Sequence, residues 1–394
     1  MTTTGLALLA TAAVGWGLAR YIGGRSLYLM AYGGVAALGL GYLLGRQRRA
    51  LVGRRSELPL RIREGQRVAV ELELEAKRRV SAVILEERLH PHFGRPKRMS
   101  IESIPGGKTV NSGYTLTAGL RGVYPVGPLV AVWTDPFGFT RHEVVLAEAQ
   151  EVIVHPTTEP VDDRPLTRQW EDPPVRPPVS KPWNSGFEFY GMRDYAPGDD
   201  IRRIVWRATA RSGRVMVREF EQGITDRVTL VLDTDALYHS PGDPSDSFEA
   251  AVRTVASLGV RHLKDGFAVT VETNEGNLAA ALRGAGSSLP FLDAMARAQA
   301  GRRPLVDAIE RMLADPRRDA HNVVVTPHLD DRAAARLKLL LDRGGAVEVV
   351  ALVWEESDPA SLSRAAALGC QVVQLRPRQP LGAVFAHEVG AGRR

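Results

Sequence analysis

The sequence predicts a multi-domain protein in which an N-terminal transmembrane α-hairpin is followed by a β-sandwich-like domain and then by a doubly wound α/β domain of Rossmann type. Three observations predict this order: two long apolar runs open the chain, apolar and polar residues then alternate, and strand-like and helix-like segments alternate toward the C-terminus. The expected boundaries are 1–50 for two transmembrane helices, 57–156 for the β-sandwich, 157–183 for a proline-rich linker, 184–226 for a distinctive polar segment and 227–380 for the α/β domain.

The composition is that of an ordinary globular protein, with 44% hydrophobic and 24% charged residues over 394 positions. The net charge of +6 arises from 51 Lys and Arg against 45 Asp and Glu. Much of the basic excess lies directly after the second apolar run, where five arginines between Arg46 and Arg55 precede the single acid Glu57. A local excess beside apolar runs favours a membrane surface, so we expect no nucleic-acid partner. The single cysteine, Cys370, lies in an apolar run and is expected to be a buried structural thiol.

Residues 5–19 and 26–45 form the two apolar runs. The second has the length of about 20 residues that crosses the hydrocarbon core, and the first reaches it if residues 2–4 are included. A cleaved signal peptide is the alternative, but no Lys or Arg precedes the first run and a second span follows at once. The arginines after residue 45 place both ends of the hairpin in the cytoplasm. We therefore expect a multi-pass protein of the plasma membrane, in contact with the lipid bilayer, whose soluble domains are cytoplasmic.

Period-two alternation predicts the β-sandwich. In the stretch RVAVELELE, residues Val68, Val70, Leu72 and Leu74 fall on one face. Further short β-rich runs are separated by Gly, Pro and Asp turns, as in a small sandwich. No metal-ligand spacing or nucleophile motif accompanies them, so this domain is expected to be a structural or docking module. The prolines of 157–183 then predict an extended, semi-rigid linker.

The most unusual stretch is GFEFYGMRDYAPGDDIRRIVWRATARSGRVMVREFEQ at 186–222. Asp199 is expected to cap a helix and Asp200 to lie in its first turn, where negative charge is favoured by the helix dipole. Ser212 and Gly213 end this helix, and RVMVREF follows as a strand. Arg202 can lie over Trp206 as a cation–π pair. The expected apolar face is Ile201, Ile204, Val205 and Ala208, and the expected basic face is Arg203, Arg207 and Arg211.

The polar residues of this segment do not form a catalytic constellation. Asp199 and Asp200 are adjacent, so on a helix they point about 100° apart and make a poor general acid–base pair. The segment contains no histidine. A structural ion-pair network is the favoured interpretation, with a docking surface for a partner or ligand as the alternative and a catalytic role the least favoured.

This segment resembles the bacterial family known as domain of unknown function 58, whose pattern combines G-x-E-F, R-x-Y-x-P-G-D-D, R-x-I-x-W, A-R-x-G and V-R-E. The chain departs from it at Val205, where the family often has a polar residue. The upstream stretch RGVYPVGPLVAVWTDPFG and the hairpin also resemble the family. The residues expected to bind a partner or to build the motif are Glu188, Arg193, Tyr195, Asp199, Asp200, Arg202, Trp206, Arg211 and Arg218.

The α/β domain begins with the buried-strand pattern VTLVLDTD, which ends at Asp233 and Asp235. Ligand sites in doubly wound sheets lie beyond the carboxyl ends of strands, where Asp233 is expected. The order of elements is similar to a von Willebrand A domain, as the resemblance implies. Many such domains hold Mg²⁺ through D-x-S-x-S, but here Leu237 offers no oxygen and Thr326-Pro327-His328 stands where a late Asp is expected. We expect no cofactor and no functional metal site, with Asp233 and Asp235 as weak candidates and Asp330 within reach.

The resemblance implies a partner of MoxR-type AAA+ ATPases, possibly together with a transglutaminase-like membrane protein. The expected function is that of a non-catalytic, membrane-anchored adaptor or scaffold whose von Willebrand A-like domain binds partner proteins. We do not expect an enzyme. The alternatives are a metal-dependent adhesion-type domain that binds peptides and, less favoured, a hydrolase or nucleic-acid-acting enzyme.

Overall fold

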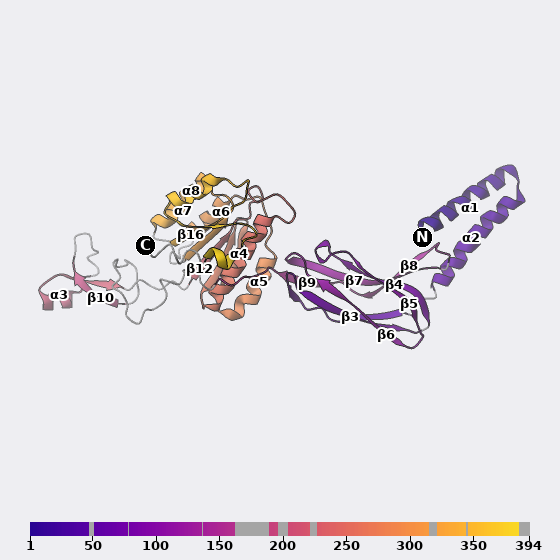
Figure 1. Cartoon of the computed structure of the whole chain (residues 1–394), viewed down its shortest axis with the longest axis horizontal. Helices are drawn as coiled ribbons and strands as arrows, with labels where there is room; N and C mark the ends of the chain where they lie inside the picture. The colour runs from indigo at the N-terminus through magenta and orange to yellow at the C-terminus, as the bar shows by residue number, and fades with distance from the viewer. Residues whose placement is uncertain are drawn as a thin grey trace. The chain divides into compact units, whose positions relative to one another are not determined.

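The computed structural model describes residues 1–46, 51–77, 79–135, 137–161, 189–195, 204–220, 227–314, 321–343 and 346–385. The chain divides into two compact units (Figure 1). The first comprises Met1–Thr157 and Leu292–Ala298, and the second comprises Thr158–Phe291 and Gln299–Arg394.

The first unit opens with the two expected apolar helices, α1 (Thr3–Ile22) and α2 (Arg25–Arg46). Both are long and apolar enough to cross a membrane. The Thr2 side chain caps α1 by accepting a hydrogen bond from the Gly5 amide, and Gly23, at φ 81°, ends it in the left-handed conformation that glycine allows. A methyl group on Gly34 of α2 would lie 3.3 Å from the Ala12 Cβ of α1, so small residues let the two helices approach closely.

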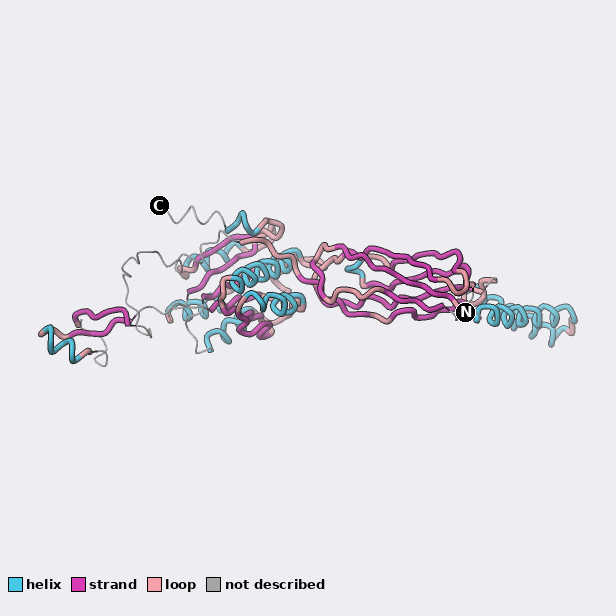
Figure 2. The backbone as a smooth tube through the Cα atoms, turned by 90° about the horizontal axis from the view of Figure 1, so that it is seen from below, coloured by secondary structure: helices cyan, strands magenta, loops and turns pink. Residues whose placement is uncertain are grey.

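The rest of the first unit is built mainly from two sheets, and their strands run along the length of the domain (Figure 2). The three-stranded sheet has the order β1-β3-β6, and the second has the order β2-β9-β7-β4-β5, with β8 also paired to β7. The bounds are β1 Leu51–Arg55, β2 Arg61–Arg63, β3 Arg67–Ala76, β4 Val80–Leu89, β5 Lys97–Ile104, β6 Thr109–Thr117, β7 Gly122–Thr134, β8 Arg141–Ala147 and β9 Gln150–His155, with a 3₁₀ turn, η1, at Pro91–Phe93.

The two sheets share one hydrophobic core, as the alternating pattern predicts. Val70, Leu72 and Leu74 of β3 are buried on one face of their strand, and they join Leu85 of β4 and Leu129 of β7 in the same cluster. Burying such aliphatic side chains contributes about 1.5–3 kcal/mol each, so this core is the main source of stability of the β domain.

A buried ion pair lies inside this domain. An Arg55 guanidinium nitrogen lies 2.5 Å from Glu87 Oε1, and the Tyr114 hydroxyl donates to Glu87 Oε2 across 2.7 Å. Burial, followed by the bond to Glu87, raises the pKa of Tyr114, so this hydroxyl keeps its proton and remains a donor. Both charges are therefore neutralised within the domain.

Residues 292–298 belong to the first unit, and basic side chains of the β domain contact them. Arg61 pairs with the Asp293 carboxylate across 2.7 Å, and His155 lies 2.7 Å from the same group. The bond from Arg61 holds the pKa of Asp293 below its ordinary value, although partial burial opposes this. Arg121, which is buried, donates to the carbonyl oxygens of Met295 and Ala298 at 3.1 and 2.8 Å.

Residues 158–161 of the predicted linker are packed in the second unit. The Glu159 amide donates to Ser257 Oγ across 3.0 Å, and its carboxylate pairs with Arg253 across 3.2 Å and accepts from the Leu381 amide across 2.6 Å. Val161 is buried. The extended chain expected over 162–183 lies outside the described residues.

The second unit contains a six-stranded sheet in the order β14-β13-β12-β15-β16-β17. Neighbouring strands are parallel except for β14, which runs antiparallel to β13 at one edge. This is the mostly parallel, doubly wound sheet that alternating strand and helix patterns predict. The bounds are β12 Arg227–Leu232, β13 Ala268–Thr273, β14 Gly276–Arg283, β15 His321–Thr326, β16 Ala346–Leu352 and β17 Gln371–Leu375.

Helices lie on both faces of this sheet (Figure 1). Ala308, Ala333 and Ala365, one from each of α6, α7 and α8, share a core with Val231 and Val324 of the sheet. Helix α4 lies on the opposite face; Ser245 caps it, acids lie in its first turn and bases in its last. The bounds are α4 Asp246–Lys264, η4 Ala285–Ser287, α5 Ser288–Ala296, α6 Leu305–Ala314, α7 Asp331–Asp342 and α8 Pro359–Ala367.

A small antiparallel hairpin precedes this sheet in the chain. Strand β10 (Phe189–Asp194) pairs with β11 (Met216–Phe220), and α3 (Trp206–Ser212) lies between them in sequence. The expected helix face is wrong at two positions, because Ile204 forms a β-bridge with Val217 and Val205 is the residue before the helix. The Val205 amide donates to the Met216 carbonyl across 2.8 Å. Ile204 and Val205 therefore pair with β11 and do not form part of a helix face. The helix ends at Ser212 with Gly213 at φ 69°, as expected.

Candidate functional site

The six-stranded sheet has one topological switch point, between β12 and β15, where the chain changes the direction in which it adds strands. Ligand sites of doubly wound sheets lie at this point, beyond the carboxyl ends of the strands. Asp233 directly follows β12, as predicted, and Thr326 is the last residue of β15. The sequence therefore places polar side chains at the position where such a fold binds ligands.

Three groups of the chain itself donate hydrogen bonds to the Asp233 carboxylate. Thr326 Oγ1 donates to Oδ2 across 2.6 Å, Asn274 Nδ2 donates to Oδ1 across 2.6 Å, and the Asp235 amide donates to Oδ1 across 3.1 Å. Asp233 is 1% exposed. Burial raises its pKa to about 6, against the opposing effect of these hydrogen bonds. Both carboxylate oxygens are thus engaged from inside the protein.

His239 forms a second buried contact beside Asp233. Its Nε2 lies 3.0 Å from the Asp233 carbonyl oxygen, and its Nδ1 lies 3.0 Å from Ser247 Oγ. Burial lowers the pKa of His239, which favours the neutral ring. A carbonyl oxygen only accepts, so Nε2 carries the proton and Nδ1 accepts from the Ser247 hydroxyl. The ring therefore links the start of α4 to the end of β12, and the Ser247 hydroxyl that it contacts is fully buried.

The acids around this centre are also engaged locally. Asp235 accepts from the Leu237 amide across 3.0 Å, and Asp330 caps α7 by accepting from the Ala333 amide across 2.7 Å. Asp330 therefore serves as the N-cap of α7. Among the described residues, no group of three or more His, Cys, Asp or Glu side chains could hold a metal ion.

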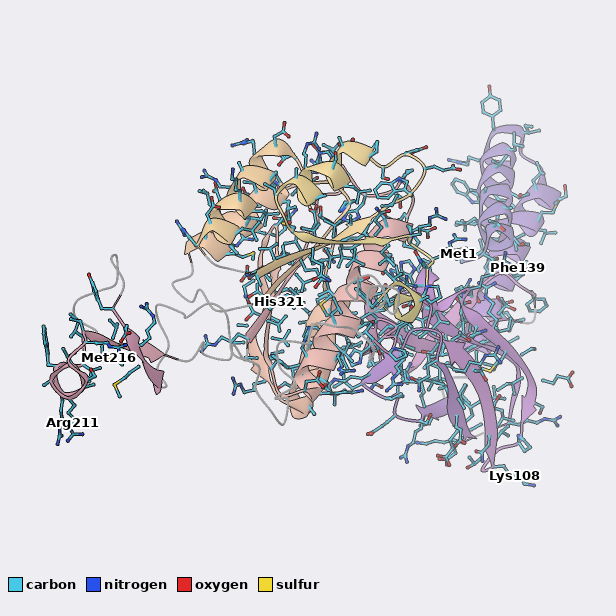
Figure 3. The ribbon with its side chains drawn as sticks, turned by 60° about the vertical axis from the view of Figure 1, so that its left-hand side comes forward. Met1, Lys108, Phe139, Arg211, Met216 and His321 are labelled. Carbon is cyan, nitrogen blue, oxygen red and sulfur yellow. The ribbon has the colours of Figure 1, made fainter. Side chains whose placement is uncertain are left out.

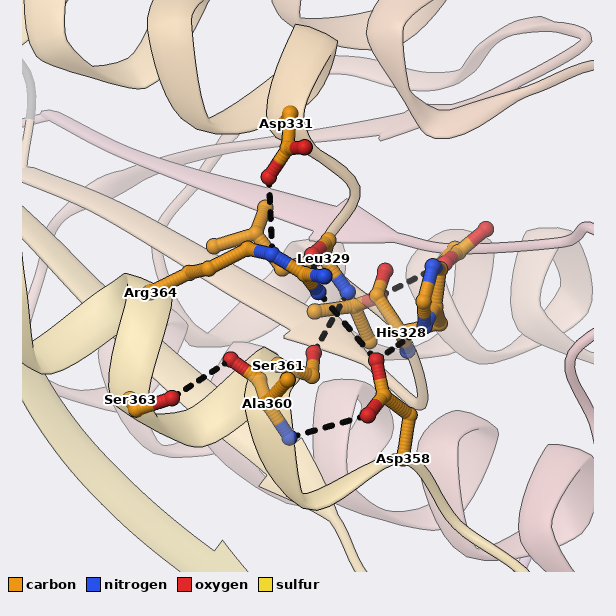
Figure 4. Close-up of polar contacts among 10 residues, drawn as sticks. His328, Leu329, Asp331, Asp358, Ala360, Ser361, Ser363 and Arg364 are labelled. Carbon is orange, nitrogen blue, oxygen red and sulfur yellow. Dashed lines mark hydrogen bonds and ion pairs between the residues drawn. The ribbon is translucent and has the colours of Figure 1, made fainter.

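The loop after β15 is tied to α8 by polar contacts (Figure 4). The Leu329 amide donates to Ser361 Oγ across 2.5 Å, and Arg364 donates to the Leu329 carbonyl across 2.9 Å. Asp358 accepts from the Ala360 amide, which lowers its pKa despite slight opposing desolvation, and Arg364 adds to the effect. His328 stacks on Tyr238 with ring centroids 4.1 Å apart. This edge of the sheet is therefore fixed by contacts within the chain.

The β10–β11 hairpin carries the described part of the predicted motif, and Figure 3 labels Arg211 and Met216 on it. Arg193, Tyr195, Trp206 and Arg211 lie on this hairpin, and the backbone of Arg218 lies in β11. Glu188, Asp199, Asp200 and Arg202 fall outside the described residues, and with them the expected helix cap and the Arg202–Trp206 pair.

Large apolar side chains of this hairpin are exposed. Trp206 is 70% exposed, Met192 47%, Val215 41% and Tyr195 37%. Arg207, Arg211 and Arg214 are also exposed. Asp194 lies 3.4 Å from Arg214, and both side chains are well exposed, so this pair adds little stability. The described surface of the hairpin is thus apolar and basic.

Residues 191–362 match the model of the family described as protein of unknown function DUF58. This segment belongs to the DUF58 family. It includes most of the β10–β11 hairpin, the switch point of the six-stranded sheet and the five strands β12 to β16. The exposed hairpin and the buried Asp233 centre are therefore both parts of the DUF58 segment.

Further comparisons concern other proteins and show only distant likeness. The comparison with curated proteins gives no match. The CARDB domain of PF1109 from Pyrococcus furiosus is 13% identical, with a TM-score of 0.20, over 27% of this chain and 94% of that one. A superoxide reductase (neelaredoxin) from Ignicoccus hospitalis is 14% identical, with a TM-score of 0.19, over 29% of this chain and 90% of that one.

Sequence reasoning missed the partners of Asp233 in the DUF58 segment. Asn274 and His239 were not singled out, and Thr326 was considered only as a replacement for a metal-binding Asp. A usable signal existed, because Asn274 directly follows β13 and Thr326 ends β15. A polar residue at the carboxyl end of each of three adjacent parallel strands indicates that their side chains meet.

Proposed function

We propose that this chain is a non-catalytic adaptor, anchored in the membrane by α1 and α2, whose DUF58 segment binds a partner protein in the cytoplasm. The observation that carries the proposal is the exposed apolar and basic surface of the β10–β11 hairpin. Trp206, Tyr195 and Met192 are types of residue that interfaces favour, and Trp, Tyr and Arg dominate binding hot spots.

The state of the Asp233 centre supports a role without chemistry. A catalytic carboxylate needs access to a substrate, but Asp233 is buried and receives hydrogen bonds from Asn274, Thr326 and the Asp235 amide. His239 is engaged at both ring nitrogens. These groups stabilise the junction of β12, β13 and β15, and the domain serves as a rigid support for binding surfaces.

The sheet order supports a von Willebrand A-like assignment for this domain. Strands β12 to β17 occur in the order 3-2-1-4-5-6, with the third strand antiparallel at one edge. In domains of this class, the edge at the switch point is a binding edge. Leu237 is 78% exposed beside Asp235, and an exposed apolar side chain at this edge supports peptide binding there. The second candidate is therefore the adhesion-type domain, although Leu237 itself offers no oxygen to a metal.

The proposed partner is a MoxR-type AAA+ ATPase, as the resemblance implies, possibly together with a transglutaminase-like membrane protein. Arg207, Arg211 and Arg214 favour an acidic surface on that partner, because opposite charges steer association. Partner and adaptor would meet at the cytoplasmic side of the plasma membrane.

An affinity purification separates the two candidates. Tagged full-length chain is extracted from membranes in mild detergent, with ATP and Mg²⁺ or with EDTA, and its partners are identified by mass spectrometry. Trp206→Ala tests the hairpin, and Leu237→Ala is the matched exposed change at the switch point. Recovery of an AAA+ ATPase that Trp206→Ala loses and Leu237→Ala keeps supports the adaptor. Loss of binding with Leu237→Ala and with EDTA supports the adhesion-type domain instead.

A further inference from the structure

The β7–β8 turn and the adjoining end of β7 are hydrogen-bonded to the two ends of the helical hairpin. The Thr2 amide donates to the Phe139 carbonyl across 3.0 Å, and its hydroxyl donates to the Gly138 carbonyl across 2.6 Å. At the other helix, Trp133 Nε1 donates to the Gly45 carbonyl across 3.0 Å. A methyl group on Gly5 would collide with the Phe139 carbonyl oxygen, so α1 is packed directly on this turn.

The lengths of the two helices place this turn at a bilayer surface. Helix α1 has 20 residues and α2 has 22, which correspond to about 30 and 33 Å. The hydrocarbon core is about 30 Å thick, so helices that span it have their ends at its boundaries. The residues that touch Thr2 and Gly45 therefore lie at the level of the lipid headgroups. This step rests on the proposed function, because it takes α1 and α2 as membrane-spanning.

The turn holds an aromatic side chain outward at that level. Phe137 is 50% exposed and stacks on Phe139 with ring centroids 5.7 Å apart. The turn is rigid because Asp135 accepts from the Phe137 amide across 2.8 Å and from the Thr140 hydroxyl across 2.7 Å. Burial raises the pKa of Asp135, but these hydrogen bonds outweigh it and hold the pKa below its ordinary value. An exposed phenylalanine at a bilayer surface gains by entering the interface.

The same end of the β domain carries four exposed basic residues, against the exposed acids Glu75, Glu102 and Glu143 of the same strand ends. Strand pairing brings the turn after β3 and the turn before β6 to this end, because Leu51 pairs with Ala76 and the Gly107 amide donates to the Ala76 carbonyl across 2.8 Å. Asp135, the acid of the β7–β8 turn, is buried and internally bonded. The exposed cations at this end are Lys77, Arg79, Lys108 and Arg141.

We propose that this end of the β domain, with Phe137 at the tip of the β7–β8 turn, binds the headgroup region of an anionic bilayer. The β domain is then a peripheral membrane module as well as a spacer. Basic residues near an anionic surface are attracted to it, and Phe137 adds apolar contact. This end of the domain also sets how deeply α1 and α2 enter the bilayer, because Thr2 and Gly45 are hydrogen-bonded to it.

The test uses the full-length chain in vesicles of phosphatidylcholine and phosphatidylglycerol. In a Cys370→Ser background, Phe137→Cys carries an environment-sensitive nitrobenzoxadiazole label, and Arg141→Cys provides a second label at the same end. Leu60→Cys is the matched control, because Leu60 is 51% exposed and its carbonyl accepts from Ile153 at the opposite end of β7. Val14→Cys, on an exposed face of α1, reports whether the hairpin is in the bilayer.

The expected result is a blue-shifted emission of the Phe137 label and its quenching by a lipid that bears a nitroxide near the headgroup, with neither effect at Leu60. Quenching at Phe137 and Arg141 should weaken when phosphatidylglycerol is omitted. A Phe137 label that behaves like the Leu60 label, while the Val14 label reports hydrocarbon, overturns this inference and leaves the membrane anchor standing. A Val14 label in water overturns the anchor itself. Equal quenching without anionic lipid overturns the role of the basic residues.

Discussion

The Thr326 hydroxyl donates to the Asp233 carboxylate across 2.6 Å and thereby joins the carboxyl ends of β12 and β15. This bond lies at the switch point of the sheet, where many doubly wound proteins bind their ligands. Here the acid is held by the chain itself, with Asn274 and the Asp235 amide as its other donors. The Asp233 carboxylate therefore joins the carboxyl ends of three neighbouring strands, β12, β13 and β15.

Replacing Thr326 by valine should destabilise the α/β domain. Valine keeps the shape but removes the hydroxyl, so one oxygen of a buried carboxylate loses its donor, at a cost of about 1–3 kcal/mol. Thr326→Ser keeps the hydroxyl and is the matched control. Urea denaturation of the full chain in detergent, followed by hydrogen exchange of peptides that cover β12 and β15, measures the loss. Equal stability of the valine and serine variants would show that the bond contributes nothing.

The stability of this domain should depend on pH through Asp233. Its pKa in the folded protein is raised to about 6 from an ordinary value of 3.8, so the folded state binds the proton more tightly than the unfolded chain. The stability from this group is complete below about pH 4 and is lost as pH rises through about 6, by about 3 kcal/mol in total. Asp233→Asn removes the titration. The difference in unfolding free energy between wild type and this variant, measured as above, should fall across that window, and parallel pH profiles would refute the shift.

The buried pair in the β domain predicts a large effect from a single change. Arg55 and Glu87 have side chains that are 5% and 0% exposed, and Glu87 also accepts from Tyr114. Glu87→Ala leaves the Arg55 guanidinium buried without its carboxylate, which costs about 3–5 kcal/mol. The neighbouring Glu86→Ala removes a pair with Arg98, whose side chain is 67% exposed, and should cost less than Glu87→Ala because the remaining guanidinium is solvated. Hydrogen exchange of β4 and β7 peptides measures both, and similar losses would contradict the argument.

The proposed transmembrane hairpin of α1 and α2 predicts from which side of the membrane a reagent can reach its turn. The proposed topology has both ends in the cytoplasm and therefore predicts that residues 23–24 lie on the outer side of the membrane. Gly24→Cys in a Cys370→Ser background should react with an impermeant maleimide added to intact cells or spheroplasts. Thr157→Cys, in the expected cytoplasmic region, should react only after lysis. The reverse pattern would invert the topology, and reaction of both before lysis would exclude the membrane-spanning hairpin.

The elements with strong local patterns were predictable from the sequence. The alternation in RVAVELELE specifies β3 and its buried face, and the apolar runs specify α1 and α2. The start of α3 was not predictable in the same way. Ile204 and Val205 fit a helical face by spacing, but they bond to β11 through Val217 and Met216, and a short apolar run suits either structure.

The partners of Asp233 could not be derived from local patterns, because tertiary structure brings them together. Asn274 and Thr326 lie 41 and 93 positions from Asp233 in the chain. They meet only because β13 and β15 flank β12 in the sheet, and strand order is not encoded in the periodicity of any one strand. The pattern of residues 233–237 points to the switch-point edge of the sheet, but it does not reveal that the Asp233 carboxylate is already hydrogen-bonded within the chain.

Site-specific photo-crosslinking tests the central claim most directly. A photoreactive amino acid replaces Trp206 in the full-length chain, in living cells, and a second variant carries it at the exposed Leu237 near the switch point. The adaptor proposal predicts a crosslink from position 206 to a MoxR-type AAA+ ATPase and none from position 237. Absence of an AAA+ crosslink at 206, or the same crosslink only at 237, would contradict the assignment of the β10–β11 hairpin as the binding surface.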